Sequence, residues 1–306
     1  MRYSLLLILL LNGFILISQV HEDKSVCKIN CDKEINKENV KVITSKMQSG
    51  NLAKLVAKAK KNKFSIRFVF VEEGTFESIT VRKKKIKRVL KDLNRAFKKA
   101  KFKFSSHSIE VLQSNLFIED LARNDRNIYI KFSNEHDLED IITVFILDHA
   151  KDFCTFTDNS ISCSRTGGFS FILSTIANNI VVSKFDLEDP KIVAHEMGHF
   201  FGLYHTFEED LFGKDNFSPN DCKTSGDCLC DTPPDPGTVF ETYVNYSTCE
   251  MIGFTDENEN EYKPMLENYM SYYKPCYLTE YKFSPQQIMV MKLAGQLEIR
   301  NKFSKN

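Results

Sequence analysis

The sequence predicts a mixed α and β domain, in which strands form a sheet and at least two helices pack against it. Residues Ile66–Val71 alternate and are mainly β-branched or aromatic, which is typical of a strand. Apolar residues then recur at helical spacing between Ile86 and Phe97, with lysine and arginine between them, which predicts an amphipathic helix. Because one such helix lies among several strand-like segments and another follows, we expect an α+β or α/β sheet domain.

Further elements are indicated by residue type and by helix-end signals. Five segments have strand composition: Ile109–Leu112, Ile128–Phe132, Ile142–Leu147, Phe169–Leu173 and Ile180–Ser183. A second helix is expected after Asp189 and Pro190, which suit an N-cap and a first turn, and Gly202 can end it. A final helix should begin at Ser284, because serine with Gln287 three residues on forms a capping box.

The N-terminal region has the composition of an export signal followed by a polar arm. Arg2 precedes an almost wholly apolar run, so residues 1–18 are expected to be a secretory signal peptide. The alternative is an uncleaved anchor, although the run is short against the ~20 residues that span a bilayer. No other stretch is long and apolar enough, so we expect no stable membrane anchor. Residues 19–60 are polar and lysine-rich, which predicts a pro-segment or mobile arm, and residues 61–306 remain as the folded domain.

Export would place the cysteines in an oxidising compartment, where disulfides are expected. There are nine: Cys27, Cys31, Cys154, Cys163, Cys222, Cys228, Cys230, Cys249 and Cys276. The number is odd, so the disulfides within one chain cannot use them all. Cys154 and Cys163 are close enough in sequence to close a local loop. Four others lie within residues 206–267, a segment rich in Asp, Glu, Asn, Gly and Pro that we expect to be irregular.

The composition, 42% hydrophobic and 27% charged, excludes a collagen, a coiled coil and a wholly disordered chain. The net charge of zero hides a basic block, with 20 Lys and Arg against 4 Asp and Glu in residues 41–104. It also hides an acidic block, with 3 against 15 in residues 205–270. The basic side chains fall between apolar helix positions and lack interleaved aromatics, which favours a solvated helix face over a polyanion-binding surface. We therefore expect no nucleic-acid partner.

One eleven-residue segment has the spacing of a metal site. His195 and His199 are four residues apart, so on a helix they lie on one face and could bind one zinc ion. Glu196 follows the first histidine and could reach a water molecule there. Gly202 allows a sharp turn that would bring His205 round as a third ligand. Three protein ligands leave a fourth position open, which is the arrangement of a catalytic zinc.

This segment, HExxHxxGxxH, resembles that of the metzincin metallopeptidases, which also carry a methionine-containing turn downstream. Asn268–Tyr272 fits that turn and places Met270 65 residues after His205. The resemblance implies that Met270 underlies the zinc site without binding the metal. It also implies that Tyr272, two residues later, helps to stabilise the oxyanion of the reaction.

Further motifs narrow the resemblance to the pappalysin family, with its ulilysin-like members. They are Gly202–Phe207, Cys222, Gly226–Asp227, Asp231–Pro233, Cys276 and Phe283–Gln287. The family implies an α+β, metzincin-type zincin fold. Its upper subdomain, residues 61–202, would hold a mixed twisted sheet and two helices. Its lower subdomain, residues 203–306, would be irregular, with the Met-turn and a C-terminal helix.

The activity that this resemblance implies is that of a secreted, extracellular zinc endopeptidase. It would hold one catalytic Zn²⁺, use Glu196 as the general base on water, and cleave internal bonds of protein or peptide substrates. The alternative is a non-catalytic secreted binding module that keeps a metal on the same fold. Loss of the glutamate or of a histidine would favour that alternative, and neither is lost.

The resemblance also implies a structural Ca²⁺ site and two disulfides. Asp227, Asp231 and Thr232 are oxygen donors that suit calcium, the alternative being a solvated acidic loop. The best-matching disulfide is Cys222 with Cys249, followed by Cys276 with Cys228 or Cys230. Cys228 and Cys230 depart from the family pattern. Cys27 or Cys31 could be a zymogen thiolate on the zinc, or the two could form a local bridge.

Specificity does not follow from the resemblance. Family members that cleave before Arg or Lys have an acidic residue just after the Met-turn. Here that stretch reads Tyr273-Lys274-Pro275 and carries no carboxylate, so a preference for basic residues is not implied. Lys274 would either favour acidic or polar side chains or point to solvent.

Overall fold

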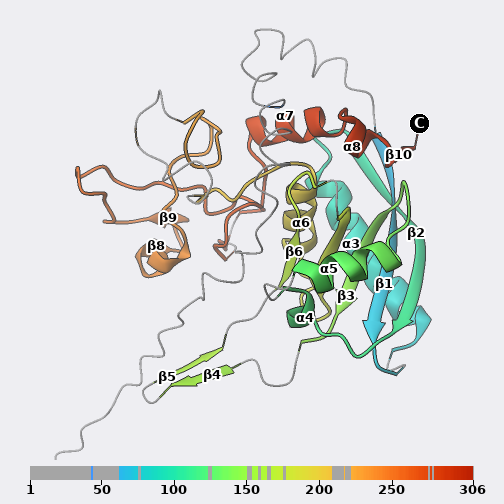
Figure 1. Ribbon diagram of the computed structural model, residues 1–306. Coiled ribbons are helices and arrows are strands. Elements are labelled where there is room, and N and C mark those ends of the chain that lie inside the picture. The colour runs from blue at the N-terminus through green and yellow to red at the C-terminus, as the bar shows by residue number, and fades with distance from the viewer. Residues whose placement is uncertain are drawn as a thin grey trace, which may run out of the picture.

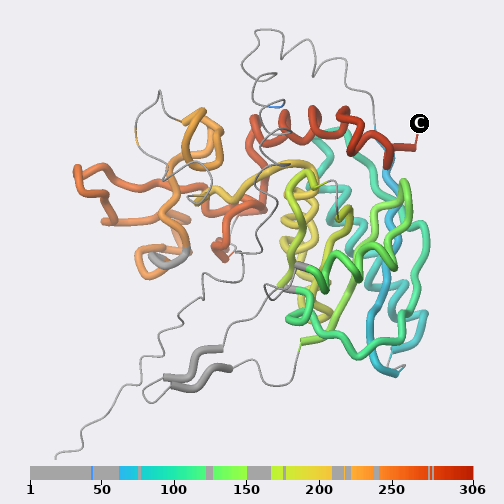
Figure 2. Tube along the Cα trace, in the orientation of Figure 1, coloured from blue at the N-terminus to red at the C-terminus, as the bar shows by residue number. Residues whose placement is uncertain are grey.

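The computed structural model describes residues 43, 62–74, 77–122, 126–149, 154–157, 160–163, 167–174, 177–208, 217, 222–274, 276–277 and 279–305. A mixed six-stranded sheet with helices on it forms one part of the molecule, and the irregular stretch of residues 222–274 lies to one side of it (Figure 1). The same arrangement can be followed along the trace in Figure 2. The expected class, α+β with a mixed sheet, is confirmed.

The sheet has the strand order β10-β1-β3-β7-β6, with β2 also paired to β1. The strands are β1 (Asn62–Glu72), β2 (Phe102–Gln113), β3 (Ile142–Leu147), β6 (Gly168–Ser170), β7 (Asn179–Ser183) and β10 (Ser304–Lys305). Strands β1, β2, β3 and β7 run parallel, whereas β6 and β10 are antiparallel to their neighbours. The central strands are buried on both faces, as parallel strands covered by helices are.

Alternate residues of β1 contribute to two cores, because successive side chains point to opposite faces. Phe68 and Phe70 pack with α3 (Ile79–Ala96) and α6 (Ile192–Phe200) on one face. Val69 and Val71 pack on the other face with α4 (Ile118–Ala122) and α5 (Arg126–His136). Helix α3 confirms the helix predicted from Ile86 to Phe97, and its buried positions include Ile86, Val89 and Leu93.

The helix ends mostly match the sequence signals. Helix α7 (Pro285–Ala294) begins at the predicted capping box, in which Ser284 and Gln287 bond each other's backbone. Helix α6 begins at Ile192, slightly later than expected. The Asp189 carboxylate still accepts a hydrogen bond from the Lys191 backbone N–H at 2.8 Å, so it orders the approach to the helix. A short α8 (Glu298–Asn301) follows α7.

The prediction of a strand at Ile128–Phe132 is wrong, because these residues lie in α5. Tyr129, Phe132 and Ser133 are buried, and they stand three and four residues apart, on one face of a helix. In a strand, Ile128 and Phe132 would point to the same face, but Ile128 is 43% exposed whereas Phe132 is buried. The alternation of Asn, Ile and Tyr in this segment resembles a strand locally, but packing against β3 and β7 selects the helix.

The segment after residue 203 contains little regular structure apart from α7, α8 and β10. It holds a 3₁₀ helix (Thr238–Tyr243), β8 (Val244–Asn245) and β9 (Glu250–Met251).

The chain before α6 also has a small hairpin of β4 (Cys154–Thr157) and β5 (Ser160–Cys163). Its register places Cys154 directly opposite Cys163, but the side chains lie outside what the structure describes, so that disulfide stays a prediction.

The disulfide pairs predicted among Cys222, Cys228, Cys230, Cys249 and Cys276 are wrong. The bonds join Cys222 to Cys230 and Cys249 to Cys276, with Cα separations of 5.0 and 5.5 Å. A tight turn closed by the bond from the Cys228 N–H to the Ser225 carbonyl folds the chain back, which brings Cys230 to Cys222. Cys228 takes part in neither bond.

Several expectations concern residues outside the described ranges. They are the signal peptide at 1–18, all of the arm at 19–60 except residue 43, and the roles of Cys27 and Cys31. Within the described residues, no helix combines the length and the apolar character needed to cross a membrane.

A buried arginine joins α8 to the end of α6. Arg300 is fully buried, and its Nε donates to the Phe200 carbonyl at 2.6 Å. Its Nη1 donates to the Ser174 carbonyl at 3.2 Å and to Asn178 Oδ1 at 2.8 Å. Its guanidinium also lies 4.0 Å from the Phe200 ring. A cation at a helix C-terminus is favourable, since the helix dipole is negative there. Burial lowers the pKa of Arg300 to about 9.

We expect Arg300→Met to lower the free energy of unfolding by about 3 kcal/mol, because it leaves buried carbonyls without donors. Urea unfolding measures this change. Arg88→Met is the matched control, because the Arg88 side chain is 56% exposed and pairs with Glu188 at the surface. A loss no larger than that of the control would contradict an anchoring role for Arg300.

Candidate metal centre

Helix α6 carries the first two histidines and the glutamate of the motif. His195, Glu196 and His199 are each no more than 5% exposed. Val193, Ala194 and Met197 of the same helix belong to the sheet-side core, so one face of the helix packs on the sheet. The histidine pair therefore projects from a rigid element, as the four-residue spacing predicts.

The three histidines converge on one point. His199 Nε2 lies 3.1 Å from His195 Nε2 and 3.1 Å from His205 Nε2. Two nitrogens bound to one tetrahedral zinc ion at 2.0–2.1 Å stand about 3.3 Å apart. Among the described residues, this is the one group of three metal-binding side chains whose ligand atoms lie this close together.

The outer ring nitrogens show which atoms face the centre. His195 Nδ1 donates to the Tyr269 carbonyl and His199 Nδ1 to the Leu203 carbonyl, each at 2.7 Å. A carbonyl only accepts, so both Nδ1 atoms carry the proton. In the neutral rings the two Nε2 atoms then present lone pairs to each other, an arrangement that a cation between them makes favourable. The residues therefore fit zinc.

Burial keeps these histidines neutral, as metal binding requires. It lowers the pKa of His199 to about 4, although the hydrogen bond to Leu203 opposes the shift. Burial also holds the pKa of His195 and of His205 well below its usual range, and neighbouring histidines add to the effect.

The turn after α6 brings the third histidine into place. Gly202 adopts a φ of +93°, a conformation that side chains other than glycine's rarely accept. The turn is closed by bonds from the Gly202 N–H to the His199 carbonyl and from the Leu203 N–H to the Gly198 carbonyl. The His205 ring then stacks on Phe207, with centroids 4.8 Å apart. The predicted role of Gly202 agrees with this geometry.

Glu196 follows His195 on α6, and one of its carboxylate oxygens has no hydrogen-bond partner among the described residues. Its carboxylate is close to Gly168 of β6, and this oxygen is the buried Oε2. The Ser170 hydroxyl donates to its backbone carbonyl at 2.7 Å. Burial raises the pKa of Glu196 to about 8. A divalent cation in the centre would favour the charged carboxylate again.

Met270 lies directly under α6, as the Met-turn resemblance implies. It is fully buried, and its sulfur fills the space where a side chain at Gly198 would begin. A Cβ at Gly198 would stand 2.6 Å from Met270 Sδ. The Met270 N–H donates to Asn268 Oδ1, and its carbonyl accepts from the Thr206 N–H at 3.2 Å. The turn is therefore bound both to the helix and to the residue after His205.

Tyr272 lies at the open side of the centre. Its side chain is 38% exposed, and its ring centroid is 5.6 Å from that of His195 and 4.8 Å from that of His205. The structure thus brings together the rings of His195, His199, His205 and Tyr272, and Glu196 adjoins His195 on α6.

The calcium candidates are engaged in hydrogen bonds within the protein. Both Asp227 oxygens accept from the Thr232 hydroxyl, at 2.8 and 2.9 Å. Asp231 accepts from the Ser284 hydroxyl at 2.7 Å and from the Gln286 N–H at 2.8 Å, at the N-terminus of α7. Within the described residues they join no cluster of three close metal-binding side chains.

Sequence reasoning missed a buried polar network beside the centre. Asp235 is 5% exposed and binds the side chains of Thr206 and Tyr273, and Lys191 is 7% exposed and donates to the Tyr273 carbonyl. Burial raises the pKa of Asp235 and lowers that of Lys191 to about 7, and the opposite charges counteract both shifts. No spacing in the sequence marks Asp235.

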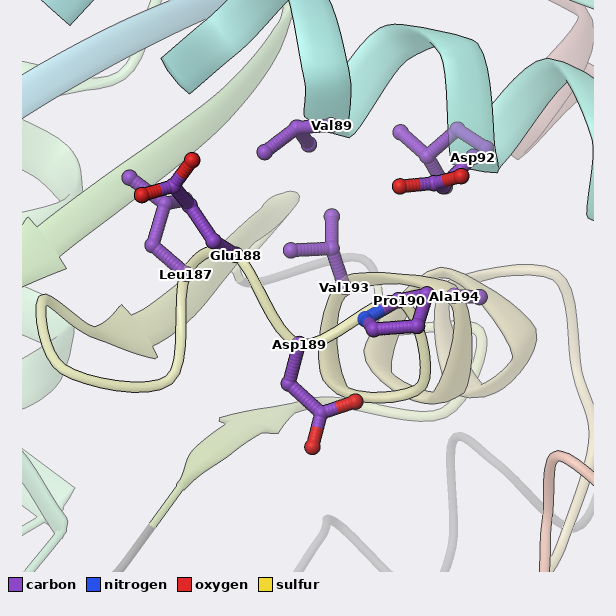
Figure 3. A pocket seen from close by; sticks show the side chains of 9 residues that line it. Val89, Asp92, Leu187, Glu188, Asp189, Pro190, Val193 and Ala194 are labelled. Atoms are coloured by element: carbon purple, nitrogen blue, oxygen red, sulfur yellow. The ribbon is translucent and has the colours of Figure 1, made fainter. Parts of the chain in front are cut away.

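A small pocket lies apart from the metal centre, between α3 and the start of α6. Its lining includes Val89, Asp92, Glu188 and Val193, and Figure 3 shows Asp189 pointing away from α3. Its volume of about 10 Å³ holds at most one water molecule, so we assign it no ligand.

Fold and site together define a metallopeptidase-like metal protein, and comparison with known proteins identifies the family. Residues 128–292, more than half of the chain, match the family model of peptidase family M43, described as pregnancy-associated plasma protein-A. The chain belongs to this family, the pappalysins.

Individual relatives match a shorter stretch. An extracellular metalloprotease of Arthroderma gypseum is 32% identical over 106 residues, which are 35% of this chain and 30% of that protein. Another, of Trichophyton verrucosum, is 29% identical over the same shares. The match thus spans less than a third of these relatives. A solved structure titled "Structure of a chaperone-substrate complex" aligns with 80% of this chain and 36% of its own, at 11% identity and a TM-score of 0.38.

The contact between Gly198 and Met270 yields a test. We expect Gly198→Ala to destabilise the fold by about 1–3 kcal/mol, because its methyl group overlaps the Met270 sulfur. Met270→Ala alone should cost about 2–5 kcal/mol. The double variant should be more stable than the sum of the two losses predicts, since the smaller residue makes room. Thermal unfolding of the four proteins measures this coupling, and strict additivity would contradict the contact.

Proposed function

We propose that this protein is a secreted zinc endopeptidase that hydrolyses internal peptide bonds of proteins. The observation that carries the proposal is the convergence of three histidines, in which His199 Nε2 lies 3.1 Å from the Nε2 atoms of His195 and His205. The next residue after His195 is a buried glutamate with an oxygen that has no hydrogen-bond partner among the described residues. Membership of a metallopeptidase family supports it. The proposed fold is the metzincin-type zincin fold, with an upper subdomain at residues 61–202 and a lower one at 203–306.

His195, His199 and His205 would hold the metal. Zinc, when bound, supplies a Lewis acid that polarises a carbonyl and lowers the pKa of water to about 7. Glu196 would accept a proton from the attacking water at its free Oε2 and pass it to the leaving amine. A divalent cation held in the centre would keep this carboxylate charged, and therefore able to accept the proton.

Tyr272 would donate a hydrogen bond to the oxyanion as the carbonyl is attacked. The packing of its ring against those of His195 and His205 supports this role, because it places Tyr272 beside the metal centre. Strand β6 is last in the strand order, and Glu196 lies beside its Gly168. An extended peptide could pair with this strand as an added β-strand, which would bring the scissile bond to the metal centre.

The contacts of Lys274 argue against a role in selecting substrates. Its side chain is 75% exposed, and its Nζ lies 3.1 Å from Glu241 Oε1. Of the two expectations for this residue, exposure to solvent has the better support.

We also propose that the protein acts outside the cell. The matched relatives are extracellular metalloproteases, and two disulfides close the segment after residue 203, as an oxidising compartment allows. A signal peptide at residues 1–18 and a zymogen segment at residues 19–60 complete this proposal. The non-catalytic binding module stays the alternative, and the following test separates the two.

We expect Glu196→Gln to bind one zinc ion per chain, as the wild type does, and to lose peptidase activity by about 10²–10⁴-fold. Cleavage of a peptide library, with metal analysis of both proteins, measures the two quantities. Glu280→Gln is the control, because that side chain is 81% exposed. If the variant cleaves as fast as the wild type, the assignment of Glu196 fails. If the wild type itself binds zinc but cleaves nothing, the binding module is favoured.

Calcium binding by Asp227, Asp231 and Thr232 stays a prediction. With zinc saturated, added Ca²⁺ should raise the melting temperature of the wild type by several degrees, since a ligand stabilises the state that binds it. Asp227→Asn should abolish this rise. An unchanged wild-type melting temperature would contradict calcium binding. It would leave these residues with only their hydrogen bonds within the loop and to the start of α7.

A further inference from the structure

We propose that Asp235 is a positioning residue of the metal centre, whose carboxylate fixes His205 and Tyr272 relative to each other. The inference rests on the proposed function, because it assigns Asp235 to the same site. Asp235 is not itself in the histidine cluster, so it would act through the residues it binds.

One buried carboxylate joins two segments that are far apart in the sequence. Asp235 Oδ2 accepts from the Thr206 hydroxyl at 2.6 Å. Its Oδ1 accepts from the Tyr273 hydroxyl at 2.8 Å and from the Gly237 N–H at 2.9 Å. Hydrogen bonds to a buried charged group are among the stronger ones in proteins.

Both partners are immediate neighbours of residues at the metal centre. Thr206 follows His205, and Tyr273 follows Tyr272. Neither His205 nor Tyr272 lies in a helix or strand. The hydrogen bonds of Asp235 therefore hold the segments of His205 and Tyr272 in place, as the backbone hydrogen bonds of α6 hold the other two histidines. The bond from the Thr206 N–H to the Met270 carbonyl joins the same two segments a second time.

Lys191 extends this connection to the start of the active-site helix. Its buried Nζ donates to the Tyr273 carbonyl at 2.6 Å, and its own carbonyl accepts from the His195 N–H at 2.8 Å. The electrostatic influence of Lys191 also opposes the rise that burial causes in the pKa of Asp235. The network of Lys191, Tyr273, Asp235 and Thr206 thus contacts the backbone of the first ligand, His195. It also contains the residues that directly follow the third ligand and Tyr272.

A positioning role and a merely structural role predict different results. If Asp235 only stabilises the fold, its loss lowers the melting temperature but leaves the zinc affinity of the folded protein unchanged. If it positions His205 and Tyr272, its loss weakens zinc binding and lowers kcat while the protein is still folded. Partners that orient metal ligands typically change metal affinity by about 10- to 100-fold.

The experiment compares Asp235→Ala and Asp235→Asn with Asp137→Asn as a matched control. Asp137 is a partly buried carboxylate, and it accepts from Ser133 at 2.7 Å and from Asn179 at 2.8 Å, next to α5 and β7. Zinc affinity is measured by competition with a chelator, and the visible spectrum of the Co²⁺-substituted protein reports the ligand geometry. For each protein kcat and KM are measured separately.

We expect Asp235→Ala to weaken zinc binding by about 10- to 100-fold, alter the Co²⁺ spectrum and lower kcat more than KM changes. Asp235→Asn should fall between it and the wild type, since one oxygen can still accept from Tyr273 and Gly237. Asp137→Asn should lower the melting temperature only. If Asp235→Ala does not fold, Thr206→Val removes a single hydrogen bond at constant shape and should weaken zinc binding in the same direction.

The proposal is overturned if the folded Asp235 variants and Thr206→Val bind zinc with wild-type affinity and give the wild-type Co²⁺ spectrum. It is also overturned if Asp137→Asn produces the same changes in the metal centre. Zinc affinity and the spectrum do not depend on peptidase activity. An inactive wild type would therefore count against the proposed function and leave these two measurements decisive for Asp235.

Discussion

The structure depends on bringing three histidine side chains to one point. Their Nε2 lone pairs face one another there, which is unfavourable without a cation between them. A helix supplies two of them, because four residues make about one turn. The third must come from a chain that reverses direction, which Gly202 allows through its positive φ. The rest of the site keeps these rings in place. Backbone carbonyls orient the rings of His195 and His199. The Met270 sulfur packs against Gly198 of α6, and another face of α6 packs on the sheet.

Two kinds of support hold the centre. On α6, backbone hydrogen bonds and packing on the sheet fix His195, Glu196 and His199, and the buried Arg300 binds the carbonyl at the end of the helix. Between α6 and α7 there is little regular structure, so polar side chains and disulfides hold the chain in place there. Asp231 at the start of α7 and Asp235 behind the metal centre are examples. The acidic character of this segment is thus partly explained by carboxylates that bind backbone and hydroxyl groups of the protein.

Apart from the Met-turn, which the family resemblance implies, the site features that the sequence predicts correctly are those that local geometry determines. The histidine spacing, the turn at Gly202 and the capping box at Ser284 each involve residues within about two helical turns of one another. The errors concern contacts between distant segments. Ile128–Phe132 is helical because Tyr129 and Phe132 find a buried surface on the sheet, and the disulfide partners depend on how the loop around Cys228 turns. Asp235 was missed for the same reason, since its partners are 29 and 38 residues away.

The pairing of β10 with β1 has a mechanical consequence. Lys63 lies opposite Lys305, so the described chain enters and leaves the sheet at one corner, and the two strands share only two residue pairs (Figure 1). A force that pulls these two ends apart would unzip that short ladder bond by bond, whereas β1 is also paired along its length with β2. The next point of resistance is the buried Arg300, which anchors α8 to the end of α6. Tension on the ends would therefore reach the metal centre only after this anchor gives way.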